Sequence, residues 1–317
     1  MLVLKDKESV KGVRYSPNGR YLATLSNYAI NIWESHSGKH LYKIPADVNY
    51  TDSIAFCPVS NDVSVIGTYP SINIYELRES LEFKRRFLGH QSWVTSITWS
   101  PDGKSIASSS VDNRIHIWEH ETGKEIKVLK MLISRRNVLR YSPDSRRLAA
   151  ATDLEGSGIY IWDCSTWKCV EILKKEYESI CAIDWAPDGE QIACACSRSD
   201  VLIVDPNTGY VVKRLKGHEE PHFDVLYSSD GETVTAICWD AIIRVWEVNT
   251  GKCVSVFSSR LRGLVRFDTF FGWDNEGIAV GSIPFFSLRT ILSGLLSAKG
   301  SLLQDPRICQ RVRMFLG

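Results

Sequence analysis

The sequence predicts an all-β chain built from one small unit that is repeated along its length. Two independent markers keep a common period of 42–44 residues, and such a period indicates a stacked repeat array rather than separate domains. The first marker is an aromatic or apolar residue before an acidic one, at Trp33, Tyr75, Trp118, Trp162, Val204 and Trp246. The second is a turn-forming quartet that begins at Ser16, Cys57, Ser100, Ser142, Ala186 and Ser228.

The third unit, Gly89–Lys130, shows the pattern most clearly. Residues 93–99 alternate and are rich in β-branched and aromatic side chains, which is typical of a strand. The quartet Ser-Pro-Asp-Gly at 100–103 predicts a turn, because proline presets φ and glycine accepts a left-handed conformation. Three further strands are expected over 104–110, 114–118 and 125–130. A four-stranded sheet of this size must stack on its neighbours, and closing the stack into a ring leaves only short edges.

The unit resembles the WD40 repeat, a family marked by Gly-His near the start of each unit and Trp-Asp near its end. The matching pairs are Gly89-His90, Gly217-His218 and Trp162-Asp163, with glutamate replacing aspartate in Trp33-Glu34, Trp118-Glu119 and Trp246-Glu247. The resemblance covers about residues 1–290 and implies a β-propeller. It is specific for the fold but says little about function, because propellers serve many roles.

From this resemblance we expect a seven-bladed WD40 β-propeller over residues 1–290. Its repeats would span about 10–44, 50–87, 89–130, 134–173, 177–215, 217–257 and 261–290. The seventh unit would have strands at 264–270, 278–282 and 283–288, and the N-terminal strand 2–5 would close it. The alternative is six full blades followed by an irregular segment. Residues 291–317 are expected to form a basic tail, irregular or helical, which is either native or the end of a fragment.

The resemblance also implies a structural hydrogen-bonded tetrad, which is complete in the third unit. Its members there would be His90, Ser108, Asp112 and Trp118. A buried indole N–H needs an acceptor, which serine can provide, while histidine bridges and aspartate orients the histidine. His90 and Asp112 could be mistaken for a catalytic pair, but we interpret them as structural. In the sixth unit, Ala236 stands where the hydroxyl should be.

Composition argues against several other classes of function. The formal net charge is +1, so no bulk attraction to nucleic acid or anionic lipid is predicted. We find no catalytic or phosphate-binding motif and no metal-ligand spacing, so we expect no catalysis, metal or cofactor. The nine cysteines show no framework spacing, and the first ten residues are too charged for a signal peptide. We therefore expect a protein of the cytoplasm, the nucleus or both, with no membrane span.

Protein binding is the function that the resemblance favours most. In WD40 proteins, the loops that enter each first strand and the turns before each third strand crowd one face, where partners often dock. A monomeric propeller within a complex would then present a protein or peptide partner with aromatic, arginine and other polar side chains. The candidates are Trp93, Tyr50, Tyr69, Arg135, Arg136, Tyr177, Arg198, Glu219, His222, Trp239 and Arg262.

Two alternative functions stay open. Tyr75, Glu76 and Arg78 resemble the short motif by which some WD40 proteins bind the adaptor of a cullin-type ubiquitin ligase as substrate receptors. The usual Trp-Asp pair is absent from this segment, and four degenerate positions arise easily by chance. The chain could also be the sensor or targeting domain of a larger protein or enzyme.

Overall fold

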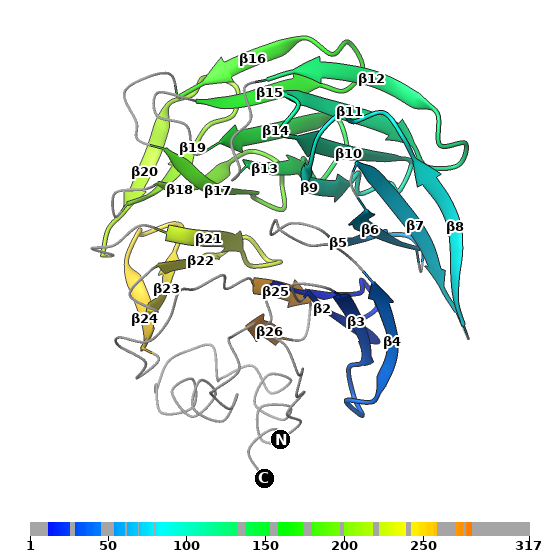
Figure 1. The fold of residues 1–317 in the computed structure, drawn as a ribbon. Coiled ribbons are helices and arrows are strands. Elements are labelled where there is room, and N and C mark those ends of the chain that lie inside the picture. Colours follow the sequence, from blue (N-terminus) through cyan, green and yellow to red (C-terminus); the bar gives the residue numbers. More distant parts are fainter. Residues whose placement is uncertain are drawn as a thin grey trace.

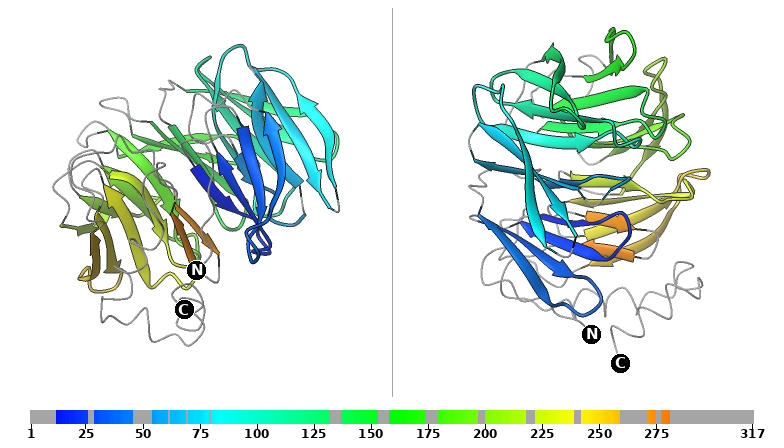
Figure 2. Two further views of the ribbon diagram at one scale, coloured as in Figure 1. Left: turned by 60° about the horizontal axis from the view of Figure 1, so that its bottom comes forward. Right: turned by 90° about the vertical axis from the view of Figure 1, so that its right-hand side faces the viewer.

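The computed structural model describes residues 12–25, 29–45, 54–60, 62–68, 70–78, 80–131, 137–152, 158–173, 179–196, 200–217, 222–238, 242–258, 271–274 and 277–280. All regular secondary structure in these segments is β-strand, which confirms the predicted all-β class. Six antiparallel sheets of four strands each follow one another along the chain. We name them blades 1 to 6, and they surround a common centre in Figures 1 and 2.

The first and second strands of each blade form its inner half. The first strands of successive blades contact one another and line the centre of the ring. They are β1 (Gly12–Tyr15), β5 (Ile54–Phe56), β9 (Val94–Trp99), β13 (Asn137–Tyr141), β17 (Ile180–Trp185) and β21 (His222–Tyr227). The second strands are β2 (Tyr21–Leu25), β6 (Asp62–Thr68), β10 (Ser105–Ser110), β14 (Arg147–Thr152), β18 (Ile192–Cys196) and β22 (Thr233–Cys238).

The third and fourth strands form the outer half of each blade. The third strands are β3 (Ala29–Glu34), β7 (Ser71–Leu77), β11 (Arg114–Glu119), β15 (Ile159–Asp163), β19 (Val201–Val204) and β23 (Ile242–Glu247). The fourth strands are β4 (His40–Pro45), β8 (Leu81–Phe87), β12 (Glu125–Lys130), β16 (Cys169–Ile172), β20 (Val211–Leu215) and β24 (Cys253–Ser258). Neighbouring blades bury apolar side chains between them, as Ile159 and Trp185 do between blades 4 and 5.

The recurring quartet forms the turn between the first and second strands. In blade 3, the Ser100 hydroxyl donates to Asp102 Oδ1 at 2.6 Å and accepts the Ser105 N–H at 2.9 Å. The turn closes through the Gly103 N–H, which donates to the Ser100 carbonyl, and Gly103 has φ +71°. Ser145 takes the equivalent place in blade 4 with φ 63°. Where the quartet has both serine and aspartate, as in blade 3, these side chains stabilise the turn by hydrogen bonds within it.

The expectation of seven complete blades is not met by the described residues. They contain six four-stranded sheets and one two-stranded sheet, β25 (Phe271–Asp274) and β26 (Gly277–Val280), which contacts β1. This hairpin pairs Asp274 with Gly277 directly across its turn, so its first strand is Phe271–Asp274. The predicted strands 2–5, 264–270 and 283–288 and the tail 291–317 lie outside the described residues.

Candidate functional site

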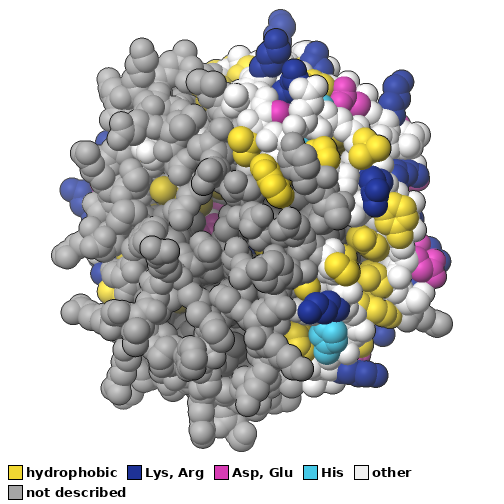
Figure 3. Space-filling view, in the orientation of Figure 1, with side chains coloured by type: hydrophobic (Ala, Val, Ile, Leu, Met, Phe, Trp, Pro, Cys, Tyr) yellow, Lys and Arg dark blue, Asp and Glu magenta, His cyan; other side chains and the backbone are white. Residues whose placement is uncertain are grey.

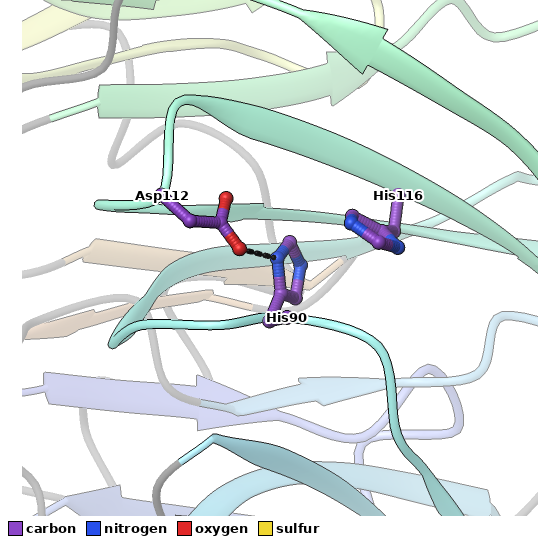
Figure 4. Close-up of side chains that lie close together, drawn as sticks. All are labelled: His90, Asp112 and His116. Atoms are coloured by element: carbon purple, nitrogen blue, oxygen red, sulfur yellow. Dashed lines mark hydrogen bonds and ion pairs between the residues drawn. The ribbon is translucent and has the colours of Figure 1, made fainter.

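A chain of hydrogen bonds crosses blade 3 from its entry loop to its third strand. His90 precedes β9, Ser108 lies on β10, Asp112 is in the turn after β10, and Trp118 lies on β11. His90 Nδ1 is 3.0 Å from Asp112 Oδ2, and His90 Nε2 is 2.8 Å from Ser108 Oγ. The Trp118 indole N–H donates to the same Ser108 oxygen at 2.9 Å. The structure thus brings together the four residues that the sequence pattern grouped (Figure 4 shows His90 and Asp112).

Burial and the neighbouring His116 ring lower the pKa of His90 to about 4, against an ordinary value of 6.5. His90 is therefore neutral at pH 7 and carries one ring proton. The contacts assign that proton to Nδ1, which donates to Asp112, while Nε2 accepts from the Ser108 hydroxyl. Burial opposes ionisation of Asp112, but hydrogen bonds from the Gln91 N–H and from His90 hold the pKa of Asp112 below its usual range. Each member of the chain is satisfied in this arrangement.

A stack of rings extends the network toward the outside of the blade. The rings of Phe87 and Trp118 are stacked at 5.3 Å, and those of Trp118 and His116 at the same centroid distance. His116 also lies 4.1 Å from His90, and its Nδ1 is 2.6 Å from Glu125 Oε2 on the outer strand β12. Sequence reasoning missed His116 and Glu125. Their proximity follows only from the pairing of β11 with β12, the adjacent strands on which the two residues lie.

Gly89 has a packing reason to precede His90. A Cβ atom at Gly89 would lie 2.7 Å from Trp118 Cη2 and 3.2 Å from His116 Nδ1. Any side chain here would collide with the ring stack, so the backbone can approach the indole only at glycine. The Gly-His marker therefore reflects a close backbone approach followed by the bridging histidine.

His90, Asp112 and His116 also form a group with metal-binding potential. Their candidate ligand atoms lie within 4.8 Å of one another, and histidine nitrogens with a carboxylate oxygen suit zinc-like ions. However, both ring nitrogens of His90 already have hydrogen-bond partners inside the blade. The cluster is therefore stable as a hydrogen-bond network without an ion, although the buried Nε2 of His116 has no partner among the described residues.

Basic side chains link neighbouring blades, and sequence reasoning missed them. Arg85 on β8 donates to the His120 carbonyl of blade 3 at 2.5 Å, and Lys213 on β20 donates to the Val248 carbonyl of blade 6 at 2.6 Å. Arg147 on β14 donates to the Gly189 carbonyl at 2.7 Å and covers the Trp185 ring at 4.7 Å. Each of these cations satisfies backbone acceptors of the following blade and so fixes blade to blade.

Comparison with known families matches two windows of this chain, 81–119 and 209–247, to the WD domain, G-beta repeat. The first window begins with β8 and ends with β11, so it includes the whole hydrogen-bonded chain of blade 3. Both windows therefore match the WD40 repeat family. Within the described residues, no helix has the length and hydropathy needed to cross a membrane.

Several curated proteins resemble part of this chain. The transcriptional corepressor LEUNIG_HOMOLOG of Arabidopsis thaliana is 30% identical over 35% of this chain and 14% of its own length. The serine-threonine kinase receptor-associated protein of Mus musculus is 25% identical over 46% of this chain and 41% of its length. The human WD repeat and SOCS box-containing protein 1 is 26% identical over 33% of this chain and 25% of its own length. The chain therefore spans less than half of these relatives.

The other blades described below keep only parts of the polar chain. In blade 1, the Trp33 N–H donates to Thr24 Oγ1 at 2.9 Å. In blade 6, where Ala236 replaces the hydroxyl, the Trp246 N–H donates instead to the Lys216 carbonyl at 3.0 Å. In blade 5, Val204 occupies the marker position and is fully buried in an apolar cluster.

The polar chain also fixes the loop that carries Trp93. The Gln91 N–H donates to Asp112 Oδ2 at 2.8 Å, and the Trp93 carbonyl accepts the Val111 N–H at 2.9 Å. Trp93 is half-buried just before β9. Of the other residues proposed for the partner-binding face, His222 begins β21. The rest lie outside the described residues, namely Tyr50, Tyr69, Arg135, Arg136, Tyr177, Arg198, Glu219, Trp239 and Arg262.

The segment that resembles a ligase-adaptor motif lies at the end of β7. Tyr75 and Glu76 are on the strand, and Arg78 follows it. The Arg78 Nε and Nη2 atoms both lie 2.6 Å from Glu76 Oε1, and the Arg78 side chain is 72% exposed. The Tyr75 ring meets the Phe83 ring edge-on at 5.7 Å.

Proposed function

We propose that this chain is a non-catalytic WD40 interaction platform, in which rigid loops around a ring are presented to a protein or peptide partner. The observation that carries the proposal is the attachment of the Trp93 loop to blade 3. The Asp112 carboxylate binds both His90 and the backbone of Gln91, so the loop is ordered before a partner arrives. Preorganisation of this kind lowers the entropy cost of binding, and a partly exposed tryptophan is a typical binding hot spot.

The related WD40 proteins are consistent with this role. Their names describe a corepressor, a receptor-associated protein and a SOCS-box protein, all of which imply association with other proteins. We propose a monomeric propeller that acts within a complex in the cytoplasm, the nucleus or both. Besides Trp93, the partner-binding face would include the other ten candidate residues of the sequence analysis. Nothing in the proposed role requires a cofactor, a metal, a nucleic acid or a membrane.

Affinity purification with mass spectrometry tests the proposal. The full chain is compared with Trp93→Ala and with Val212→Ala, which truncates a valine that is 52% exposed on the outer strand of blade 5. We expect Trp93→Ala to lose one or more partners that Val212→Ala retains. Partners bound equally by all three proteins would show that the binding face is wrongly chosen.

A second candidate function is that of a substrate receptor for a cullin-type ubiquitin ligase. Two observations favour it: the exposed Arg78 beside Glu76, and the likeness to a protein whose name includes a SOCS box. The ion pair with Glu76 holds the guanidinium at the blade rim, where an adaptor could reach it. Co-purification with a ligase adaptor that is lost in Arg78→Ala would support this role, and the absence of any adaptor from the purified material would reject it.

A further inference from the structure

The core between blades 1 and 2 is bordered by more half-buried hydrophobic residues than the cores of the other described blade interfaces. Five half-buried hydrophobic residues border this core, against three for the cluster of blades 3 and 4 and one each for two others. Four of the five lie on the outer strands, and Phe83, which is 54% exposed, adjoins them. We name Leu41, Tyr42, Tyr75, Leu81 and Phe83 the blade 1–2 surface.

Strand register explains why these side chains gather on one side of blade 2. Tyr75 pairs with Phe83 across β7 and β8, and Leu77 pairs with Leu81. Cross-strand partners lie on the same face of a sheet, so Tyr75, Leu81 and Phe83 all face blade 1. A bulge between Ile74 and Tyr75 then reverses the alternation. Arg85, beyond the bulge, consequently reaches blade 3 instead.

Blade 1 contributes the opposite side of this surface. Leu41 and Tyr42 on β4 pack on the same core as Tyr75 and Leu81. In Figure 3, hydrophobic side chains collect over the side of the molecule where β4, β7 and β8 lie, with Lys and Arg side chains next to them. Tyrosine and phenylalanine offer large contact areas at low cost in conformational entropy, as binding hot spots do.

The charges around the blade 1–2 surface are mostly positive. Lys39, just before β4, and Lys43, within β4, are both exposed, while Lys84 and Arg86 lie on β8. Arg86 also covers the Phe83 ring at 5.9 Å. The acidic residues nearby are fewer, at Glu34, Glu76 and Glu82, and Glu76 pairs with Arg78 and lies 4.0 Å from Lys84. An approaching chain would therefore meet an apolar centre within a basic rim.

We propose that the blade 1–2 surface binds a segment of a partner protein that combines acidic residues with large apolar ones. Apolar side chains of the segment would cover Tyr42, Tyr75 and Phe83, and its carboxylates would lie against the basic rim. Burying apolar area supplies the affinity, and the opposite charges supply orientation and speed of association. The inference rests on the proposed role as an interaction platform, but it names a second surface, away from Trp93, and the chemistry of its ligand.

Selection from a random peptide library on the full chain tests this inference. The library is panned in parallel on the unchanged chain, Phe83→Glu, Val212→Glu and Trp93→Ala. Phe83 and Val212 are exposed to a similar extent on outer strands, so Val212→Glu is a matched control for adding a charge. Thermal unfolding of each variant checks that it folds. We expect peptides rich in Asp, Glu, Leu and Phe that bind Phe83→Glu about tenfold more weakly or worse and bind Val212→Glu unchanged.

Each other result overturns the inference. Selected peptides that bind Phe83→Glu as tightly as the unchanged chain would place their site elsewhere, and basic or uncharged peptides that depend on Phe83 would refute the proposed ligand chemistry. Peptides that depend on Trp93 alone would reject the blade 1–2 surface while supporting the proposed function. If no peptide is enriched on the unchanged chain, the blade 1–2 surface is rejected. The proposed function is then judged separately by the partner purification.

Discussion

Blade 3 and blade 5 have the same strand order but are stabilised by different chemistry. In blade 3, a polar chain from Asp112 to Trp118 runs through the sheet, and every link is a hydrogen bond of 2.8–3.0 Å. In blade 5, Val204 replaces the tryptophan and lies in an apolar cluster with Ile192 and Cys194. Because both sheets form, the polar chain is not needed to make a blade. Its specific effect is to fix the entry loop that carries Trp93.

Truncating the marker residue in each blade should separate the contribution of the polar chain to stability from that of apolar packing. We expect Trp118→Ala to lower the free energy of unfolding by about 4 kcal/mol, because it removes a buried indole and strands its hydrogen-bond partner. Val204→Ala should cost about 2 kcal/mol, since it removes only methyl groups. Urea unfolding followed by circular dichroism measures both. Equal losses would mean that the polar chain adds nothing beyond packing.

Acid should weaken blade 3 selectively. The pKa of His90 is lowered to about 4, so between that pH and 6.5 the unfolded chain binds a proton that the folded chain excludes. The contribution of His90 is therefore complete above pH 6.5 and is lost as the pH falls toward 4, by about 3 kcal/mol. Unfolding free energies at pH 7 and pH 4.5 should differ less in His90→Gln than in the unchanged chain. Identical pH slopes would contradict the neutral histidine.

Removing the hydroxyl from blade 3 and adding one to blade 6 tests whether its effect on stability depends on the blade. Ser108→Ala should cost about 2 kcal/mol, because the Trp118 N–H and His90 Nε2 both lose their partner. The reciprocal change in blade 6, Ala236→Ser, should bring no gain, because the Trp246 N–H already donates to Lys216. Both variants are compared by thermal unfolding. Stabilisation by Ala236→Ser would show that the missing hydroxyl is the reason why blade 6 lacks the polar chain.

The smallest expected effect concerns the link between blades 4 and 5. Arg147→Lys keeps the charge but removes the planar fork that donates to Gly189 and covers Trp185. We expect a loss of about 1 kcal/mol in unfolding free energy. Lys213→Arg at the next interface serves as the comparison, since it retains a cation near the Val248 carbonyl. A larger effect of Lys213→Arg would indicate that the cation–ring contact contributes little.

Local chemistry made much of the fold predictable. The turn at Ser100–Gly103 depends on side chains within the turn itself, so four residues sufficed to predict it. The grouping of His90, Ser108, Asp112 and Trp118 came from the family resemblance, which could be applied because one unit contains all four residues. In the seventh unit, the strand expected at 278–282 overlaps β26, which pairs with β25 at Asp274 and Gly277, while the strand expected at 264–270 lies outside the described residues.

Contacts between blades could not be read from the sequence. Arg85 reaches the His120 carbonyl 35 residues away, and nothing local marks it as different from its neighbour Arg86. A bulge decides which of these side chains faces which blade, and bulges depend on pairing with another strand. The blade 1–2 surface was missed for the same reason, since its residues come from two separate repeats. Trp93 stays a predicted partner-binding residue, and the attachment of its loop to Asp112 through the Gln91 N–H was not predicted.

The matched windows do not coincide with the sheets. Window 81–119 contains the fourth strand of blade 2 and the first three strands of blade 3. If this window were deleted, β12 would follow β7 along the chain and could complete blade 2 in place of β8. Loss or gain of a window thus changes the number of sheets by one without creating a three-stranded remnant. Arrays with this offset can gain or lose a window by recombination, and every sheet still receives its fourth strand from the adjacent window.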